Sequence, residues 1–396
     1  MIQLLVDGII FQKDPHGGIA RMFQGILPRM CVMEPELRVK LFIDGPLRCE
    51  LPVHPQIVIQ KAPAIKRTLR VRGAWRTLIF PIRRTASRLW NLTRSLWLGR
   101  GRGVIWHSTY YTVPDIWDGS QVVTVHDMIH EQFPELFNDR LDEVARRQKQ
   151  RCVEHADAII CVSDVTRQHV EHRYGKPAGT LYVIPSAYNE EFCILEPGEC
   201  HLCEAPEQSF LLYVGNRAPY KNFKSLIDVY SRWEARSDIR LVVVGTMWSV
   251  EEKLYLNRLG ITDRVQLMNH VDDQTLCKLY NRALALVFPS LYEGFGVPLL
   301  EAMACGCPVI ASHIPTTLEV AGDCPLYFEP SQPNTFLAAL DRVRSEGKDP
   351  VRSQRGLERV HLFSWDRTAR ETLEVYHSLP EEYHSPKGKL LKNSDA

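Results

Sequence analysis

The chain has 396 residues, which is enough for two domains of ordinary size, and its composition of 45% hydrophobic and 24% charged residues is that of a globular protein. A formal net charge of +1 gives no global case for nucleic-acid binding. The chain has eleven cysteines, which is an odd number, and it is too large to need disulfide bonds for stability. Both points favour reduced thiols and a cytoplasmic location. The N-terminal MIQLLVDGII has no basic region, and no apolar run approaches the roughly eighteen residues of a membrane span, so we expect neither a signal peptide nor a transmembrane helix.

The N-terminal half alternates short apolar runs with helical patterns. The runs predict strands at residues 2–10, 39–44, 57–59, 104–107, 121–125, 158–162 and 181–184, and Ser163 is expected to cap the helix that follows the sixth of them. Gly17 and Gly18 come after the first strand and lead into an amphipathic helix near 19–30. His126 and Asp127 follow strand 121–125, at the carboxyl end where open α/β sheets bind ligands. A plain turn is the alternative for the glycines, and a structural role is the alternative for the histidine.

Residues 61–102 are strongly basic. No aspartate or glutamate lies between Leu51 and Pro114, whereas twelve lysines and arginines do, interleaved with leucines and with Trp75, Phe80, Trp90 and Trp97. This pattern is typical of a segment that lies on an anionic membrane surface. A solvated helix and a nucleic-acid patch are the alternatives.

The C-terminal half repeats the alternation after a polar linker. We predict domains at 1–188 and 209–363, joined by a linker at 189–208 and followed by a helix at 364–380 and a polar tail at 381–396. Strands are expected at 210–214, 239–245, 265–268, 284–288 and 308–312, and the helical pattern of the helix after the second domain extends over 362–379. The CxxC pair Cys200 and Cys203 lies in the linker without a second pair at zinc spacing, so free thiols are expected there.

The stretch at 284–312, LALVFPSLYEGFGVPLLEAMACGCPVIAS, combines a strand, a glycine turn and a helix that opens near Pro298. Gly294 and Gly296 allow main-chain N–H groups to point inward at the start of the helix, where anions such as phosphate bind. Glu293 and Glu301 cannot hold phosphate, so they are suited to accept hydrogen bonds from hydroxyl groups. Together these features predict a site for a nucleotide that carries a sugar.

This stretch, with Glu293, seven residues and Glu301 set in EGFGVPLLEAMACGCPVIAS, resembles the signature of the retaining glycosyltransferases of family 4. The resemblance implies the GT-B fold, an α/β architecture in which two Rossmann-like domains face a cleft and the C-terminal helix crosses back to the N-terminal domain. It also implies sugar transfer from a nucleotide-sugar donor to a saccharide or lipid-linked acceptor, with retention at the anomeric carbon. No metal or other cofactor is expected, and the chain has no Asp-x-Asp motif.

The resemblance assigns roles in the second half of the chain. Glu293 would bind the hydroxyl groups of the donor sugar, and Glu301 those of the ribose. The N–H groups near Phe295, Gly296 and Val297 would bind the diphosphate. Main-chain groups near Val271 would contact the nucleobase.

Cations after Gly215 would also hold the diphosphate, because cleaving the glycosyl–phosphate bond leaves a growing negative charge. Lys221 falls at the family's spacing. Asn216 stands where the family often has arginine, and Arg217 is one position further on. From the other domain, the N–H groups of Gly17 and Gly18 would approach the diphosphate, and His126 would lie near the reacting sugar.

Two alternatives share the fold, a sugar phosphorylase and a nucleotide-sugar epimerase, and neither needs a basic, aromatic membrane segment. A non-catalytic nucleotide-sugar-binding subunit is the alternative of a different class, and the presence of Glu293, Glu301, Lys221 and His126 favours an enzyme instead. The segments EGFGVP and GNRAPYKN resemble those of polysaccharide mannosyltransferases, which favours GDP-mannose over another GDP-sugar or a UDP-sugar. We therefore expect a glycosyltransferase of cell-surface glycan or lipopolysaccharide synthesis, located in the cytoplasm and peripheral to the inner face of the membrane.

Overall fold

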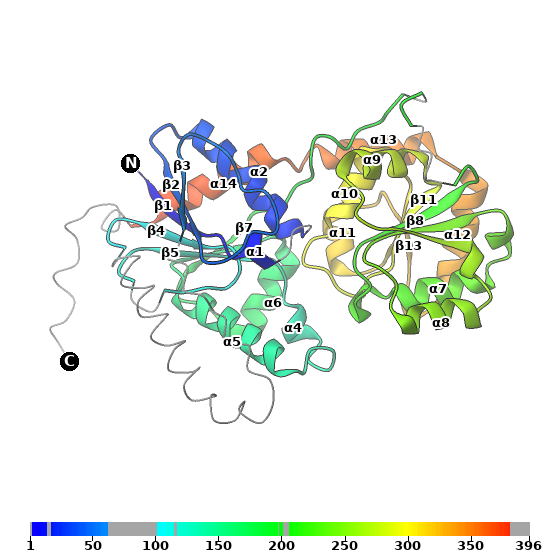
Figure 1. The fold of residues 1–396 in the computed structure, drawn as a ribbon, viewed down its shortest axis with the longest axis horizontal. Coiled ribbons are helices and arrows are strands. Elements are labelled where there is room, and N and C mark those ends of the chain that lie inside the picture. Colours follow the sequence, from blue (N-terminus) through cyan, green and yellow to red (C-terminus); the bar gives the residue numbers. More distant parts are fainter. Residues whose placement is uncertain are drawn as a thin grey trace.

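A computed structural model describes residues 2–13, 17–61, 101–114, 117–196, 198–200 and 206–380. Within these ranges the chain forms two α/β lobes that lie side by side, each built around a parallel sheet (Figure 1). This arrangement confirms the predicted fold class of two Rossmann-like domains.

The first sheet has seven strands in the order β3-β2-β1-β4-β5-β6-β7. Its strands are β1 (Gln3–Asp7), β2 (Arg38–Ile43), β3 (Ile57–Lys61), β4 (Ile105–Ser108), β5 (Gln121–Val125), β6 (Ala158–Cys161) and β7 (Thr180–Val183). The described helices of this lobe are α1 (Ile10–Lys13), α2 (Gly18–Met33), α4 (Ile129–Gln132), α5 (Arg140–His155) and α6 (Asp164–Tyr174). One hydrophobic cluster joins the sheet to α2, and a second joins it to α5 and α6 on the other face.

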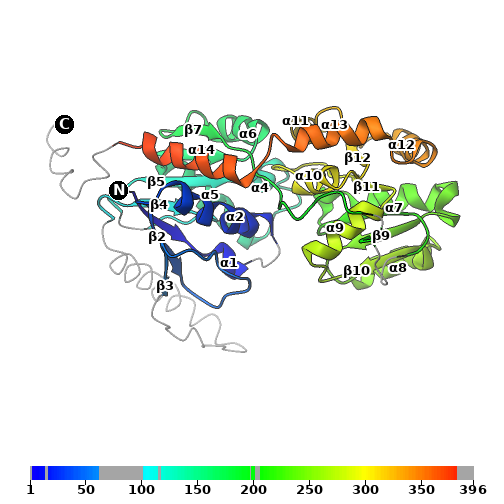
Figure 2. The ribbon, with the colours of Figure 1, turned by 90° about the horizontal axis from the view of Figure 1, so that it is seen from above.

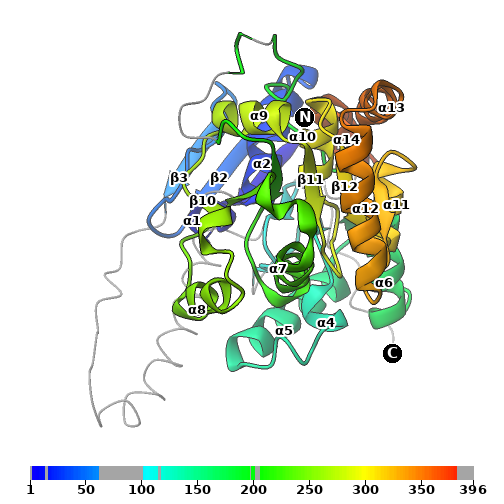
Figure 3. The ribbon, with the colours of Figure 1, turned by 90° about the vertical axis from the view of Figure 1, so that its right-hand side faces the viewer.

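The second sheet has six strands in the order β10-β9-β8-β11-β12-β13. Its strands are β8 (Phe210–Val214), β9 (Arg240–Val244), β10 (Val265–Met268), β11 (Ala285–Phe288), β12 (Val309–Ser312) and β13 (Leu326–Phe328). The helices are α7 (Phe223–Arg232), α8 (Val250–Arg258), α9 (Asp273–Arg282), α10 (Val297–Ala304), α11 (Pro315–Ala321), α12 (Pro333–Glu346) and α13 (Pro350–Val360). α9 and α10 pack in one cluster and α7, α8 and α12 in another, so helices cover both faces of this sheet (Figure 3).

The last described helix, α14 (Trp365–Ser378), returns to the first lobe and packs against α2. Figure 2 shows α13 on the second lobe continuing into α14 on the first. Trp365 is buried, and a Cβ at Gly25 would lie 3.0 Å from its ring, so glycine lets the two helices approach closely. The hydroxyl of Tyr376 lies 2.6 Å from Nδ1 of His107 in the sheet. The predicted crossing helix is thus confirmed.

Most strand predictions hold to within a residue or two, and those at 121–125, 210–214 and 265–268 match at both ends. Ser163 caps α6 as expected, accepting a hydrogen bond from the N–H of Thr166. The prediction of a strand over 2–10 was wrong at its end, because β1 stops at Asp7. At Gly8 the chain turns against β2, where a Cβ would lie 2.8 Å from the carbonyl oxygen of Phe42, and α1 follows.

The glycine pair therefore does not follow β1 directly, since α1 intervenes and Gly17 is the N-cap of α2. The last helix also begins later than predicted, at Trp365, because Ser364 caps it by accepting from the N–H of Arg367. Of the basic segment 61–102, residues 62–100 lie outside the described part, as does the tail 381–396. None of the described helices is both long and apolar enough to cross a bilayer.

Candidate functional site

Glu293 lies in the turn between β11 and α10 and is paired with Lys221. Both carboxylate oxygens accept from Nζ of Lys221, at 2.7 and 2.9 Å, and the hydroxyl of Ser290 donates to one of them at 2.6 Å. Burial by itself would lower the pKa of Lys221, but the facing carboxylate outweighs burial and raises it. The structure thus brings two predicted site residues together, 72 positions apart in the chain.

The turn ends at Gly296, whose φ of 108° favours glycine, and α10 begins at Val297 with Pro298 in its first turn. No side chain caps the N-terminus of α10. The predicted strand, glycine turn and helix are therefore present, and N–H groups of the first helical turn have no intrahelical acceptor.

Glu301 is buried inside α10 and is contacted from both lobes. The hydroxyl of Tyr280 donates to Oε2 at 3.0 Å, and Nη1 of Arg21 lies 3.4 Å from Oε1. Burial raises the pKa of Glu301 to about 7, against the lowering effects of Arg21 and Tyr280. The same guanidinium forms an ion pair with Asp273 at the start of α9. Arg21, on α2, thus links the first lobe to a predicted ribose-binding carboxylate.

Arg217 is held by an ion pair with Glu252, whose two oxygens lie 2.6 and 3.1 Å from Nε and Nη2. Nη2 also donates to the carbonyl oxygen of Met247, and the guanidinium stacks 4.5 Å above the ring of Trp248. Nη1 is buried and has no hydrogen-bond partner among the described residues. A Cβ at Gly245, the residue after β9, would lie 3.1 Å from this atom, which places Nη1 at the carboxyl edge of the sheet. One donor of Arg217 therefore remains available to an anion.

Val271 lies in the loop between β10 and α9. Residues 266–272 and Thr275 line a surface hollow of about 230 Å³ there. The loop bends at His270, whose φ is +54°. The loop that is predicted to contact a nucleobase therefore borders a surface hollow.

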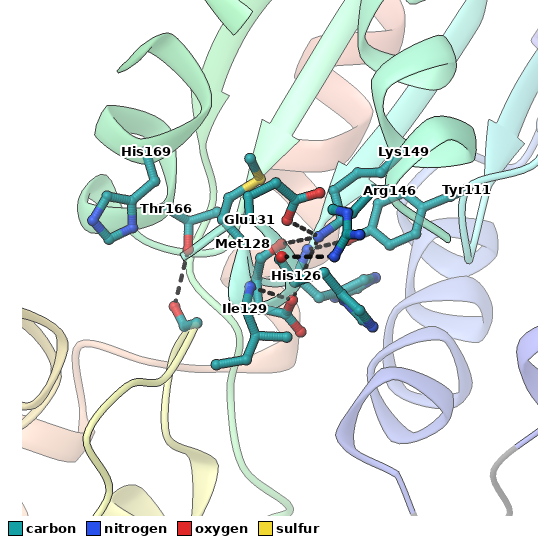
Figure 4. Close-up of polar contacts among 12 residues, drawn as sticks. Tyr111, His126, Met128, Ile129, Glu131, Arg146, Lys149, Thr166 and His169 are labelled. Atoms are coloured by element: carbon teal, nitrogen blue, oxygen red, sulfur yellow. Dashed lines mark hydrogen bonds and ion pairs between the residues drawn. The ribbon is translucent and has the colours of Figure 1, made fainter. Parts of the chain in front are cut away.

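His126 and Asp127 follow β5 in the first lobe, as predicted. The N–H of His126 donates to the hydroxyl of Tyr111, and Nε2 is buried and lacks a hydrogen-bond partner in the described structure. Burial lowers the pKa of His126 to about 4, so its imidazole is neutral at pH 7. Burial acts to raise the pKa of Asp127, but Lys149 and the N–H of Ile129 outweigh it and the net shift is downward. Figure 4 shows Tyr111, Ile129 and Lys149 around His126 at the turn that follows β5.

The loops after β5 and β11 meet directly. A Cβ at Gly294 would lie 1.8 Å from the carbonyl oxygen of His126, so no larger residue fits there in this arrangement. The hydroxyl of Ser163, at the start of α6, donates to the carbonyl oxygen of Gly294 at 2.7 Å. The N–H of Met128 donates to the hydroxyl of Tyr292 at 2.9 Å. Glu293 is therefore flanked by two residues that contact the first lobe.

A second set of contacts joins α6 to α11. The carboxylate of Glu319 accepts from the N–H groups of Asp164 and Val165, at 2.6 and 3.0 Å, which are the first two residues of α6. A carboxylate at a helix N-terminus satisfies free N–H groups and opposes the positive end of the helix dipole. This contact and the contact at Gly294 both join the first lobe to the second.

The sequence interpretation did not single out Arg21, Tyr292 or Lys149. Arg21 lies three residues after Gly18 and Tyr292 lies beside Glu293, so proximity to predicted site residues was a usable signal for both. Lys149 carries no such signal, because it lies in a strongly charged helix 22 positions from Asp127. Gly17 and Gly18 are at the start of α2, but no described side chain ties them to the groups above.

Two protein families match separate parts of the chain. Residues 54–192 match the family described as Glycosyltransferase Family 4, and residues 203–356 match the one described as Glycosyl transferases group 1. The two matches do not overlap, and each falls within one of the two lobes together with part of the linker.

Similar curated proteins include two that are named as O-antigen chain mannosyltransferases. O-antigen chain mannosyltransferase B of Escherichia coli is 27% identical over 383 residues, which is 93% of this chain and 97% of that protein. O-antigen chain mannosyltransferase RfbU of Salmonella typhimurium is 27% identical over 236 residues, 60% of this chain and 64% of that protein.

Solved structures share the fold over nearly the whole chain. Sucrose-phosphate synthase from Thermosynechococcus elongatus superposes with a TM-score of 0.70 at 18% identity, covering 96% of this chain and 99% of that one. WaaG, a glycosyltransferase involved in lipopolysaccharide biosynthesis, gives a TM-score of 0.68 at 15% identity, covering 95% and 100%. HepE of Anabaena, solved with UDP and glucose, gives 0.63 at 16% identity, covering 96% and 100%.

Proposed function

The chain belongs to the glycosyltransferases, with a family 4 domain in its first half and a group 1 domain in its second, and we propose that it is a mannosyltransferase of O-antigen type glycan synthesis. The donor would be GDP-mannose and the acceptor a growing or lipid-linked saccharide. Two curated relatives named as O-antigen chain mannosyltransferases support this assignment, and one of them aligns over 93% of the chain. The observation that carries the proposal is the turn holding the Lys221–Glu293 pair, which contacts the His126 turn of the other lobe through Gly294.

The charges of the second lobe suit a nucleoside diphosphate. Lys221 and the unpartnered Nη1 of Arg217 would bind the diphosphate together with N–H groups near Phe295–Val297, and these charges would stabilise the leaving group without a metal. Glu301 would accept hydrogen bonds from the ribose hydroxyls, which would replace Arg21 as its partner. The main chain near Val271 would contact the base.

The donor sugar would lie between Glu293 and His126. Glu293 would accept from sugar hydroxyls, and the neutral imidazole of His126 offers Nε2 as an acceptor. We propose retention through front-face attack, in which the leaving phosphate takes the proton of the acceptor hydroxyl as the glycosyl–phosphate bond breaks. The transition state would resemble an oxocarbenium ion. The contact between the loops would help to exclude water from the donor.

A panel of nucleotides and nucleotide-sugars tests the donor. A true ligand at a hundred times its dissociation constant stabilises the fold by about 2.7 kcal/mol, so GDP should raise the melting temperature measurably and UDP should not. Transfer from GDP-mannose to a saccharide acceptor should persist in EDTA, and NMR of the product should show the anomeric configuration of the donor. If neither nucleotide shifts the melting temperature, the donor assignment is wrong.

Membrane association is a separate part of the proposal. Its support is the sequence of the basic, aromatic segment 61–102, whose central residues lie outside the described structure, and the lipid-linked acceptor expected for such a glycan. The enzyme would act on the cytoplasmic face of the membrane. Co-sedimentation with vesicles rich in anionic lipid should exceed that with neutral vesicles, and equal or absent binding would contradict the proposal.

A further inference from the structure

Lys149 on α5 is a buried cation that no predicted role uses. Its side chain is 1% exposed and pairs at 2.8 Å with Oε2 of Glu131, whose side chain is also 1% exposed. Nζ also donates to the main-chain carbonyl oxygen of Asp127 at 3.0 Å and lies 3.6 Å from the Asp127 carboxylate. Figure 4 shows Lys149 and Glu131 beside the turn that carries His126.

The contacts of Lys149 reach His126 from both sides. After His126 in the chain, Lys149 holds the carbonyl of Asp127. On the other side, Nζ lies 5.1 Å from the centre of the Tyr111 ring, and the hydroxyl of Tyr111 accepts from the N–H of His126. Tyr111 has a φ of +54°, a conformation that costs a non-glycine residue free energy and therefore needs surrounding contacts to hold it. One ammonium group thus contacts both the residue that follows His126 and the tyrosine that accepts from its N–H.

Stability alone gives a weak reason for this pair. Removing two charges from water is costly, and well-packed apolar residues in place of a buried ion pair are often as stable or more so. Apolar side chains border the pair, since Cys152 and Val153 of the same helix belong to the hydrophobic cluster of this face. The pair is nevertheless complete, because the hydroxyl of Tyr174 donates to the second oxygen of Glu131 at 3.1 Å. Lys149 donates a hydrogen bond to the carbonyl oxygen of Asp127 in the turn, and an apolar residue at this position could not make that bond.

We propose that Lys149 is a positioning residue for sugar transfer: anchored by Glu131, it fixes the Asp127 carbonyl and the Tyr111 ring and thereby the place of His126. This inference rests on the proposed role of His126 at the donor sugar. Lys149 itself touches no substrate in this account and acts only through the turn.

The kinetic test uses a double variant, Lys149→Met with Glu131→Gln, which removes both members of the buried ion pair together. Because misplacing a catalytic group by about 1 Å can cost 10²-fold in rate, kcat should fall roughly 10²-fold while the donor KM stays within about threefold. The matched control is Tyr174→Phe, which removes the other hydrogen bond of Glu131 and leaves the Lys149–Asp127 contact, and it should keep kcat within about threefold. A double variant with the kcat of the wild type would overturn the inference.

A second measurement keeps the inference separate from the proposed function. Nitrogen-detected NMR of the histidine rings reports the protonation and the environment of His126 without any substrate. In the double variant the His126 resonances should shift and its pKa should rise, because Lys149 lowers that pKa whereas Asp127 and the main chain of Thr109, which both remain, raise it. His313, which pairs with Glu329 in the second lobe, serves as an internal reference.

Unchanged His126 resonances in a folded double variant would overturn the inference even if no donor were found. Failure of every donor with the wild type, together with the expected shift of His126, would instead overturn the proposed function and leave the inference standing. If the double variant does not fold, Lys149→Leu with Glu131→Gln serves in its place, with the same expected results.

Discussion

The two sides of the site are built in different ways. The second-lobe side, which consists of Lys221, Glu293 and Glu301, takes both carboxylates from a single turn and helix between β11 and β12. The first-lobe side, which consists of His126 and Asp127 with Tyr111, Glu131 and Lys149 behind them, is drawn from three segments. Functional residues that lie in one contiguous segment can be recognised from their spacing in the sequence. Residues from separate segments come together only after the lobe has folded. The first-lobe side should therefore depend more on positioning residues than the second.

The largest effect is expected on the second-lobe side. Glu293→Gln keeps an oxygen that can accept from Ser290 but removes the charge paired with Lys221, so transfer should fall roughly 10³-fold. The fold should remain, because the turn keeps its main-chain contact with Thr316, but the melting temperature should fall because Lys221 loses the carboxylate that faces it, so turnover is measured well below that temperature. Glu329→Gln, a surface carboxylate of the same lobe, is the control for the charge change. Wild-type turnover in the Glu293 variant would refute the role of this residue.

The meeting of the two sides should be the next most sensitive point. In Gly294→Ala the added Cβ would lie 1.8 Å from the carbonyl oxygen of His126, so the loops must separate. We expect kcat to fall roughly 10²-fold while the affinity for GDP, which the proposed site binds through the second lobe, stays within about twofold. Gly198→Ala is the matched control, since no atom lies within 4 Å of its added Cβ. An equal loss of GDP affinity would show that the contact supports the second lobe itself.

Arg217 distinguishes a binding role from a structural one within the second-lobe side. Hydrogen bonds to charged groups contribute about 1.5–3 kcal/mol, so Arg217→Met should weaken nucleotide-sugar binding roughly tenfold to a hundredfold. Calorimetric titration measures this directly. Arg342→Met, which breaks an exposed pair on α12, should leave the affinity unchanged. If the Arg217 variant loses melting temperature but binds the donor normally, the residue only holds Glu252.

The smallest expected effect is a pH dependence of donor binding through Glu301. Burial raises the pKa of this carboxyl to about 7, so it is mostly protonated at pH 6 and mostly ionised at pH 8. Both oxygens accept from hydroxyl groups only in the carboxylate, because protonation turns one of them into an O–H donor, so affinity for the nucleotide-sugar should rise with pH, by up to about tenfold between pH 6 and 8. A nucleotide-sugar is the right probe, because the terminal phosphate of a free nucleotide titrates in the same range.

Two variants sharpen this pH measurement. Glu301→Gln has no titrating group and should bind with a flat profile. Because Arg21 lowers the pKa of Glu301, Arg21→Gln should move the midpoint to higher pH. A wild-type profile that remains in Glu301→Gln would assign the pH dependence to another group.

The sequence by itself determined most of the strand positions, β13 excepted, and the two-domain class, and it predicted the residues on the second-lobe side. Apolar runs and glycine turns act over a few neighbouring residues, so Phe210–Val214 and the Glu293–Glu301 stretch could be interpreted without the fold. The end of β1 could not be predicted in this way, because apolar residues continue through Ile10. Only the contact of Gly8 with β2 decides where the strand ends.

Tertiary structure alone decided which residues complete the site. Arg21 meets Glu301 across 280 positions, and Lys149 meets Asp127 across 22, through the packing of α2 and α5 onto the first sheet and of one lobe against the other. Such contacts leave no local period or turn signal, because each partner satisfies its own helix or loop equally well without the other. The carboxylates of the second lobe could be predicted from one short stretch of sequence. The groups that contact the His126 turn could be identified only in the folded structure.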